Sequence, residues 1–197
     1  MEVMIVTDFQ TKMQNAVIGI AGLGGLGSNV AIALARLNPA GLIIVDFDRV
    51  EAGNLNRQQY YPDQVGSCKT DAMTANLKRI APALKIEACN VKLTAENIPR
   101  IFAKADIIAE CFDRPQEKQM IVETVISKMD QPIVSASGVA GYGRSNEITT
   151  KQLSSRLILV GDDVSGVGDG TVLTSTRVGL AAYHQANAIV EVIIDKL

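Results

Sequence analysis

The glycine pattern that follows the first apolar run constrains the fold of this chain more than any other feature. Residues 16–21 are apolar apart from one glycine, which suits a buried strand. Gly22, Gly24 and Gly27 follow in the spacing Gly-x-Gly-x-x-Gly. The first permits a tight turn, the second lets the backbone approach a phosphate, and the third lets the next helix pack closely on the sheet. The N–H groups at the start of that helix, near Ser28, attract an anion.

A carboxylate follows the second apolar segment. Residues 42–46 favour a second strand, and Asp46 at its end lies 19 residues past Gly27. At that place a carboxylate can accept a hydrogen bond from a ribose hydroxyl. Together the two features predict a nucleotide-binding site, but they do not say which nucleotide binds.

Composition narrows the class of protein. The chain has 197 residues, 47% of them hydrophobic, and a net charge of −2, which fits a single folded domain over residues 1–197. No run of Lys and Arg occurs, so nucleic acid is not an expected partner. No apolar stretch is long enough to span a bilayer. The three cysteines, without a Cys-x-x-Cys pair, argue against disulfides and structural zinc, and they favour a cytoplasmic setting.

Alternating patterns along the chain predict the architecture. Helices are expected at residues 7–14, 25–37, 68–80, 95–103, 115–128 and 176–197, and strands at 16–21, 42–46, 84–88, 106–112, 133–136 and 156–160. This alternation indicates an α/β fold, with a doubly wound, mostly parallel, Rossmann-like sheet. The part after Ser137 is irregular and ends in a long closing helix, which is apolar enough to be buried centrally or shared with a second subunit.

Three polar residues follow the second strand at helical spacing. Asn54, Arg57 and Gln58 stand at positions i, i+3 and i+4, so in a helical turn they share a face. Arg57 could then bind a triphosphate with two parallel hydrogen bonds. The alternative is a solvated surface arginine beside a capping asparagine.

Lys69 lies at a helix start, a position that is unfavourable for a lysine when nothing else is bound there. If Ser67 caps the third helix, Lys69 lies in the first turn, where the helix dipole opposes a cation by roughly 0.3–1 kcal/mol. A phosphate bound near this helix start would make a lysine favourable there, because the two charges attract. The nearby Asp71 could also offset it, so a purely structural explanation stays open.

Asp113 directly follows the expected strand 106–112. Ligands of open α/β sheets bind beyond the carboxyl ends of the strands, so Asp113 should face the same crevice as Gly24 and Asp46. A carboxylate beside a triphosphate is a natural Mg²⁺ ligand. Otherwise Asp113 begins a turn before Arg114 and a proline. The carboxylates of the Asp/Gly loop 161–170 do not match an EF-hand and indicate a loop without calcium.

The motifs together resemble a known superfamily. The ordered segments G-L-G-G-L-G-S, V-D-F-D-R-V, N-L-N-R-Q, V-G-S-C-K and C-F-D are similar to those of the ubiquitin-activating-enzyme-like proteins. Within that superfamily the chain looks most like the small bacterial ThiF-type adenylyltransferases for the sulfur carrier of thiamine synthesis. The resemblance covers residues 17–143, and the segment R-V-G-L-A-A-Y-H-Q-A-N extends it.

The resemblance implies a reaction. Such enzymes bind ATP with Mg²⁺, and the C-terminal Gly-Gly carboxylate of a ubiquitin-like sulfur carrier attacks the α-phosphate to give an acyl adenylate and pyrophosphate. A carboxylate is already ionised at neutral pH, so no general base is required. A homodimer is also implied. By motif, the nucleotide would be held by Gly22, Gly24, Gly25, Gly27, Asp46, Asp48, Asn54 and Gln58, with Arg57, Lys69 and Asp113 as catalytic groups and Asp113 as the metal ligand.

The chain departs from the family pattern at several places. Arg114 follows Asp113 where many relatives have asparagine, and Glu110 stands where aspartate is commoner. No arginine precedes Arg36, although some relatives supply an N-terminal arginine to the phosphates across a dimer. No cysteine follows Cys111, so a later thioester or persulfide step is not expected.

Three alternatives stay open at this point. A nicotinamide-dependent oxidoreductase shares the glycine loop and Asp46, but offers no reason for Lys69 or the segment N-L-N-R-Q. A non-catalytic member of the superfamily could bind a carrier without activating it. Carriers other than that of thiamine synthesis are also compatible with the motifs. The glycine-rich residues 135–143 are predicted to give the carrier's extended tail a close backbone path.

Overall fold

The computed structural model describes residues 2–166 and 171–196. Its first half contains α1 (Glu2–Asn15), β1 (Val17–Ala21), α2 (Gly25–Ala35), β2 (Gly41–Val45), the short 3₁₀ helices η1 (Ala52–Asn54) and η2 (Pro62–Gln64), α3 (Lys69–Ile80) and β3 (Lys85–Cys89). Its second half contains α4 (Ile98–Ile101), β4 (Ile107–Glu110), α5 (Pro115–Lys128), β5 (Ile133–Ala136), η3 (Ser145–Glu147), β6 (Thr149–Gln152), β7 (Leu157–Gly161) and α6 (Ser175–Lys196).

The strands form one sheet in the order β3-β2-β1-β4-β5-β7-β6. Every neighbouring pair is parallel except β6 with β7, which is antiparallel. From β1 the chain winds outward first through β2 and β3 and then, on the other side, through β4 and β5. The predicted doubly wound, mostly parallel α/β fold is confirmed. Its topological switch point lies between β1 and β4, where ligands of such folds bind.

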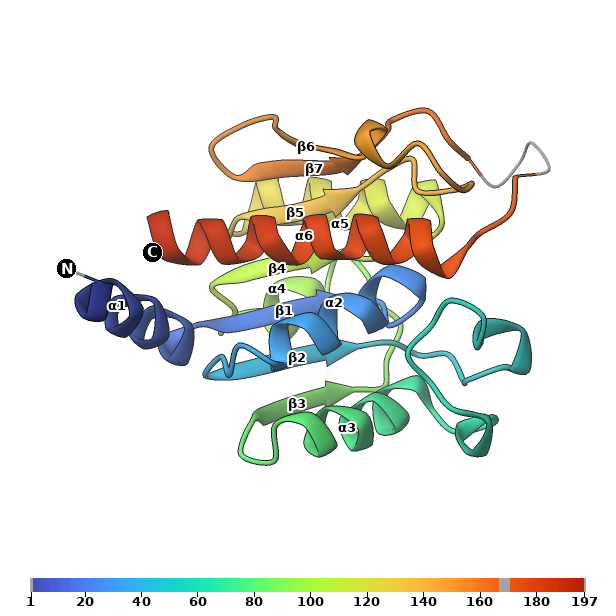
Figure 1. Ribbon diagram of the computed structural model, residues 1–197, viewed down its shortest axis with the longest axis horizontal. Coiled ribbons are helices and arrows are strands. Elements are labelled where there is room, and N and C mark those ends of the chain that lie inside the picture. Colours follow the sequence, from blue (N-terminus) through green and yellow to red (C-terminus); the bar gives the residue numbers. More distant parts are fainter. Residues whose placement is uncertain (1, 167–170, 197) are drawn as a thin grey trace.

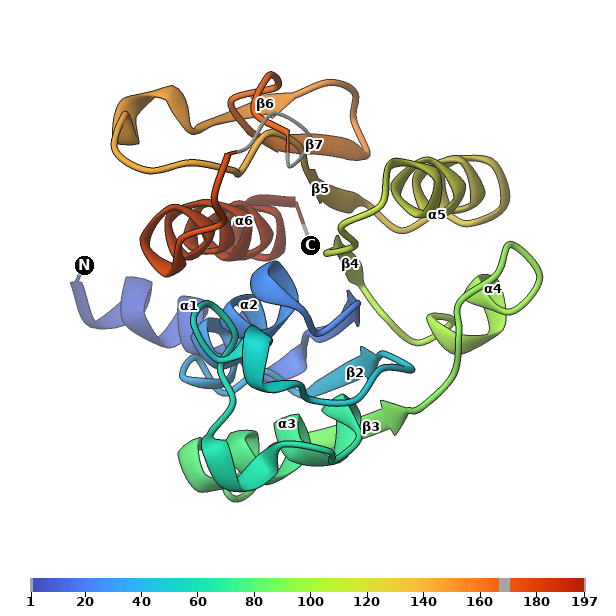
Figure 2. The ribbon, with the colours of Figure 1, turned by 90° about the vertical axis from the view of Figure 1, so that its right-hand side faces the viewer.

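Helices cover both faces of the sheet (Figures 1 and 2), with α1, α2, α3 and α6 on one face and α4 and α5 on the other. Each face has its own apolar core. Ile18 and Ile20 of β1 belong to the core under α2 and α6, whereas Phe102 and Ile121 belong to the core on the α4 and α5 side. Covering on both faces explains why the inner strands are nearly continuous apolar runs.

The closing helix α6 is buried within its own chain. It packs against α2 and crosses β4, β5 and β7, and Ala181, Ala182 and Ile189 are fully buried. Its apolar character therefore has an explanation inside one chain, and the homodimer stays a prediction. Among the helices of the described residues, none has the length and apolar character that crossing a membrane requires.

Several element boundaries differ from expectation for local reasons. The first helix is longer, Glu2–Asn15, and α4 is shorter, Ile98–Ile101. Ser67 is not the N-cap of α3: Cys68 takes that position without a side-chain cap. The cause is a backbone pairing between residues 48–50 and 66–69, in which the Ser67 carbonyl accepts from Val50 N–H and the Asp48 carbonyl accepts from Lys69 N–H.

The sequence pattern also missed β6, because its four residues are polar and mostly exposed at the edge of the sheet. The remaining strand and helix ends lie within a few residues of the expected ones, and α5 and β5 match fully. Residues 167–170 of the Asp/Gly loop lie outside the described residues, as does the last residue of the expected final helix.

Candidate functional site

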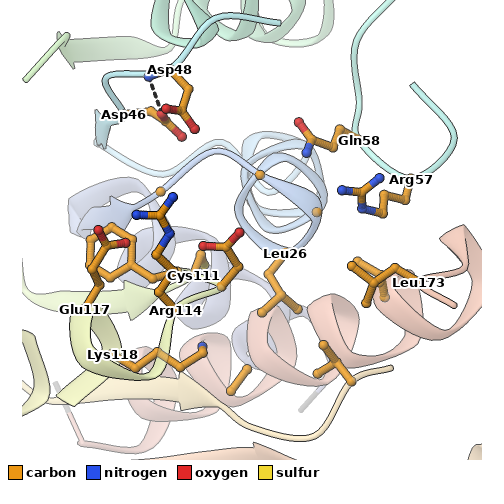
Figure 3. Close-up of a pocket in the computed structure, with 18 of the residues that line it drawn as sticks. Leu26, Asp46, Asp48, Arg57, Gln58, Cys111, Arg114, Glu117, Lys118 and Leu173 are labelled. Carbon is orange, nitrogen blue, oxygen red and sulfur yellow. Dashed lines mark hydrogen bonds between the residues drawn. The ribbon is translucent and has the colours of Figure 1, made fainter. Parts of the chain in front are cut away.

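A cavity of about 710 Å³ opens at the carboxyl ends of the parallel strands. Its lining comes from the turns after β1, β2, β4 and β5 and from the start of α2 (Figure 3). This is the crevice expected at the switch point of a doubly wound sheet. The predicted site residues that line it are Gly22, Gly24, Gly25, Asp46, Asp48, Asn54, Arg57, Gln58, Lys69 and Asp113.

The turn from β1 into α2 depends on two of the glycines. Gly22 has a φ of 93°, a backbone conformation that side chains disfavour. A Cβ on Gly27 would lie 1.8 Å from the Gly22 carbonyl oxygen. Gly27 therefore lets α2 pack against the turn rather than lining the cavity itself. These are the conformational roles expected for the first and third glycine.

The second glycine faces open cavity. A Cβ on Gly24 would have the Gln58 Nε2 atom, 3.8 Å away, as its nearest neighbour. Gly24 is also the N-cap of α2, without a side-chain cap, and the first N–H groups of a helix have no partner within it. The start of α2 thus offers backbone donors to an anion at a point where a side chain would intrude.

If the nucleotide predicted from the sequence is ATP, Gly24→Ala is expected to fold normally and to weaken its binding by about tenfold, because the added methyl group would occupy the space through which a phosphate reaches the helix start. Calorimetric titration with ATP would measure this change. Gly53→Ala is the matched control, because a Cβ there meets nothing within 4 Å and Gly53 does not line the cavity. Equal ATP affinity in Gly24→Ala and the control would contradict a phosphate at this helix start.

Asp46 is tied to the glycine turn. Its Oδ2 accepts from Leu23 N–H at 2.6 Å and its Oδ1 accepts from Asp48 N–H at 2.8 Å. Tyr60 supports the same turn, because its buried hydroxyl donates to the Leu23 carbonyl at 2.8 Å. Burial, together with the charges of Asp46 and Asp48, raises the pKa of Tyr60 well above its ordinary value. Tyr60 thus stays a neutral donor, a role that sequence reasoning missed.

Lys69 lies between two carboxylates at the wall of the cavity. Its Nζ is 2.9 Å from Asp48 Oδ2 and 3.9 Å from Asp46 Oδ2, and the lysine side chain is 7% exposed. These carboxylates, together with Asp71 in the first turn of α3, offset the unfavourable helix dipole at the start of that helix. Lys69 and Asp48 nevertheless both face the cavity, so a ligand phosphate could compete for the amine.

Asn54, Arg57 and Gln58 line the cavity from the end of η1 and the turn that follows it. The Asn54 carbonyl accepts from the N–H groups of both Arg57 and Gln58, which gives the helical turn expected from their spacing. The Asn54 side chain accepts from Glu51 N–H at 3.3 Å, so it also caps this turn. Within the part of the chain that the structure describes, the Arg57 guanidinium donates to oxygens of its own segment alone, those of Gly53 and Asn56.

Gln58 is the least satisfied side chain of the cavity wall. It is 8% exposed, and among the described residues its Oε1 is a buried acceptor without a hydrogen-bond partner. Leaving such an atom unsatisfied costs about 1–3 kcal/mol. A hydroxyl or amino group of a ligand beside Gly24 would remove that cost.

Asp113 lies on the turn from β4 to α5 and lines the cavity. Arg114, the N-cap of α5, and Glu117 and Lys118 in the first turns of α5 line the cavity as well (Figure 3). Among the described residues, no three His, Cys, Asp or Glu side chains gather as a metal site of their own. Mg²⁺ that is bound mainly by phosphates needs only one or two protein carboxylates. The exposed carboxylate of Asp113 fits that requirement, and Glu117 is a neighbouring carboxylate that sequence reasoning missed.

The far wall of the cavity consists of small and apolar residues from 136–140 with Leu173 and Val178. A buried ion pair, Asp162 with Arg177, fastens this wall to the start of α6 at 2.5 Å. Burial alone would raise the pKa of the Asp162 carboxyl. Hydrogen bonds from the Ser165 and Val164 N–H groups, from the Ser165 hydroxyl and from Arg177 outweigh burial and lower this pKa to about 2.

Comparison with known proteins identifies the family. The model of the ThiF family matches residues 2–196. The chain belongs to the ThiF family. The adenylyltransferase and sulfurtransferase uba4 of Aspergillus niger is 35% identical over 136 residues, which are 68% of this chain and 28% of the relative. The ubiquitin-like modifier-activating enzyme 5 of Bombyx mori is 30% identical over 153 residues, which are 70% of this chain and 38% of the relative.

Solved structures agree with the ThiF-family fold. Escherichia coli TcdA, a tRNA N6-threonylcarbamoyladenosine dehydratase solved with ATP, superposes with a TM-score of 0.84 at 20% identity, covering 95% of this chain and 89% of that one. E. coli MccB with ATP gives 0.74 at 21% identity, covering 95% and 59%. At these identities the likeness concerns the fold. The ThiF-family chain described here spans about a third of the curated relatives named above.

Proposed function

We propose that this ThiF-family chain binds ATP with Mg²⁺ and transfers adenylate to a carboxylate of a second substrate. One observation carries the proposal: Arg57, Lys69 and Asp113, which come from separate segments, line one cavity with the start of α2. The names of its relatives support the reaction class, because uba4 and its counterpart in Caenorhabditis briggsae are adenylyltransferases.

The residues of the chain account for what this reaction needs. The start of α2 binds phosphate through backbone N–H groups, and Arg57 and Lys69 neutralise charge from separate segments. Mg²⁺ held by Asp113 would supply further neutralisation of the phosphates. The attacking carboxylate is ionised at neutral pH and needs no base. Catalysis then reduces to alignment and to stabilising charge on the leaving pyrophosphate.

We further propose that the second substrate is the C-terminal Gly-Gly tail of a ubiquitin-like sulfur carrier, as in thiamine synthesis. The far wall supports this choice, because none of its residues from 136–140, Gly138 among them, has a long or charged side chain. A tail without side chains can approach such backbone closely.

The test is ATP–pyrophosphate exchange with candidate carriers, each with and without its terminal Gly-Gly. Exchange that requires the intact tail is the expected result. Exchange that ignores the tail would remove the proposed nucleophile, and no exchange with any carrier would favour a non-catalytic member. Parallel calorimetric titrations with ATP and NAD separate the proposal from an oxidoreductase, because only ATP is expected to bind.

A further inference from the structure

Beneath the cavity, at the end of β4, lies a carboxylate that the proposed reaction does not use. Glu110 is fully buried, and a buried carboxylate is retained only where its charge is paired and its oxygens are hydrogen-bonded. Because it lies beneath the proposed metal ligand, its contacts show what it holds in place.

Three donor groups from three segments make four hydrogen bonds to the Glu110 side chain. Its Oε1 accepts from Phe112 N–H at 2.6 Å and from Lys118 Nζ at 3.1 Å. Its Oε2 accepts from Ser135 Oγ at 2.6 Å and from Lys118 Nζ at 3.0 Å. Both oxygens therefore act only as acceptors, as an ionised carboxylate does.

Each donor lines the cavity or belongs to an element that leads into its lining. Phe112 immediately precedes Asp113, and Lys118 belongs to α5, which begins two residues after Asp113. Ser135 belongs to β5 and precedes the small residues of the far wall. In addition, Gln185 of α6 donates to the backbone carbonyl of Glu110 at 2.8 Å. The Glu110 carboxylate thus joins the turn that carries Asp113 to β5, the strand that leads into the far wall.

We propose that Glu110, neutralised by Lys118, is a positioning residue that holds Asp113 in register with the phosphate site at the start of α2. This inference rests on the proposed function, since it assumes that Asp113 binds the metal of the nucleotide. It concerns a residue that acts through Asp113 and does not itself touch the substrates.

The chemistry explains why glutamine could not replace Glu110. An amide has one acceptor oxygen and an NH₂ group, so it would turn donors toward Ser135, Phe112 or Lys118. The turn before Asp113 would lose part of its anchorage. Partners that orient a metal ligand typically contribute 10–100-fold to metal affinity.

The informative variant is the double substitution Glu110→Gln/Lys118→Met, which removes both charges together and leaves no unpaired ion. Its test is the binding of Mn²⁺, a stand-in for Mg²⁺ at oxygen ligands, followed by electron paramagnetic resonance in the presence of a non-hydrolysable ATP analogue. We expect Mn²⁺ affinity to fall by about 10–100-fold, with metal-free binding of the analogue unchanged. Lys128→Met is the matched control, because Lys128 lies at the exposed end of the same helix.

A second variant guards against a simple loss of folding. Lys118→Arg keeps the cation and its hydrogen bonds to Glu110, so it should keep Mn²⁺ affinity within about threefold of the unaltered protein. Affinity equal to the unaltered protein in the folded double variant would overturn the proposal. So would a loss in Lys118→Arg as large as in the double variant.

Asp113→Asn, measured alongside, separates the two proposals. If Asp113→Asn weakens Mn²⁺ binding and the double variant does not, the role of Glu110 falls and the metal site stands. If neither variant weakens it, Asp113 is not the ligand and both fall. If both variants weaken it while no carrier supports exchange, the positioning role stands and the proposed reaction falls.

Discussion

Arg57→Ala is expected to lower ATP–pyrophosphate exchange by about 10²–10³-fold, the usual cost of removing one donor that stabilises developing charge. The guanidinium lines the cavity beside the start of α2 (Figure 3). Among residues 2–166 and 171–196 its donors reach Gly53 and Asn56 alone, so it anchors no other described segment. The loss should therefore appear in turnover, with the unfolding temperature nearly unchanged.

Two further variants make the Arg57 result specific. Arg100→Ala is the matched control: Arg100 is an exposed arginine near the end of α4 that does not line the cavity, and its exchange rate should stay at that of the unaltered protein. Arg57→Lys keeps the charge and loses the paired donor geometry, so it should recover only part of the rate. Full activity in Arg57→Ala would place the triphosphate elsewhere.

Local sequence signals predicted the backbone geometry around the cavity. Gly22 and Gly27 have roles that depend only on the backbone within a few residues, a φ of 93° at one and a 1.8 Å approach at the other. The helical turn from Asn54 to Gln58 is likewise a matter of spacing. Asp113 could be placed because a parallel sheet brings the carboxyl ends of its strands to one edge.

Contacts between distant segments were beyond such signals. The pairing of Lys69 with Asp48 and the loss of Ser67 as a cap both follow from the backbone pairing of residues 48–50 with 66–69, which no periodicity reveals. The support of the glycine turn by Tyr60 depends on a partner 37 positions away. The strand β6 has a polar sequence without an apolar pattern, and it forms a strand because it pairs with β7.

The buried ion pair between Asp162 and Arg177 gives the largest effect on stability that we expect from a single substitution. Both side chains are at most 5% exposed, and removing one partner of a buried pair typically costs about 3–5 kcal/mol. Asp162→Asn should therefore lower the free energy of unfolding by that amount, measured by urea denaturation. Asp163→Asn is the matched control, because Asp163 pairs with Lys151 at the surface and such pairs contribute about 0–1 kcal/mol.

The same pair predicts how stability responds to acid. The pKa of Asp162 is about 2 in the folded chain against an ordinary value of 3.8, so the folded state favours the ionised carboxylate. This contribution is fully present above about pH 4 and is lost as the pH falls toward 2; a shift of this size corresponds to about 2 kcal/mol. Asp162→Asn lacks the titrating group, so the stability difference between it and the unaltered protein should shrink by that amount between pH 5 and pH 2. A difference that stays constant over this range would show that Asp162 is not held ionised by Arg177 and the neighbouring N–H groups.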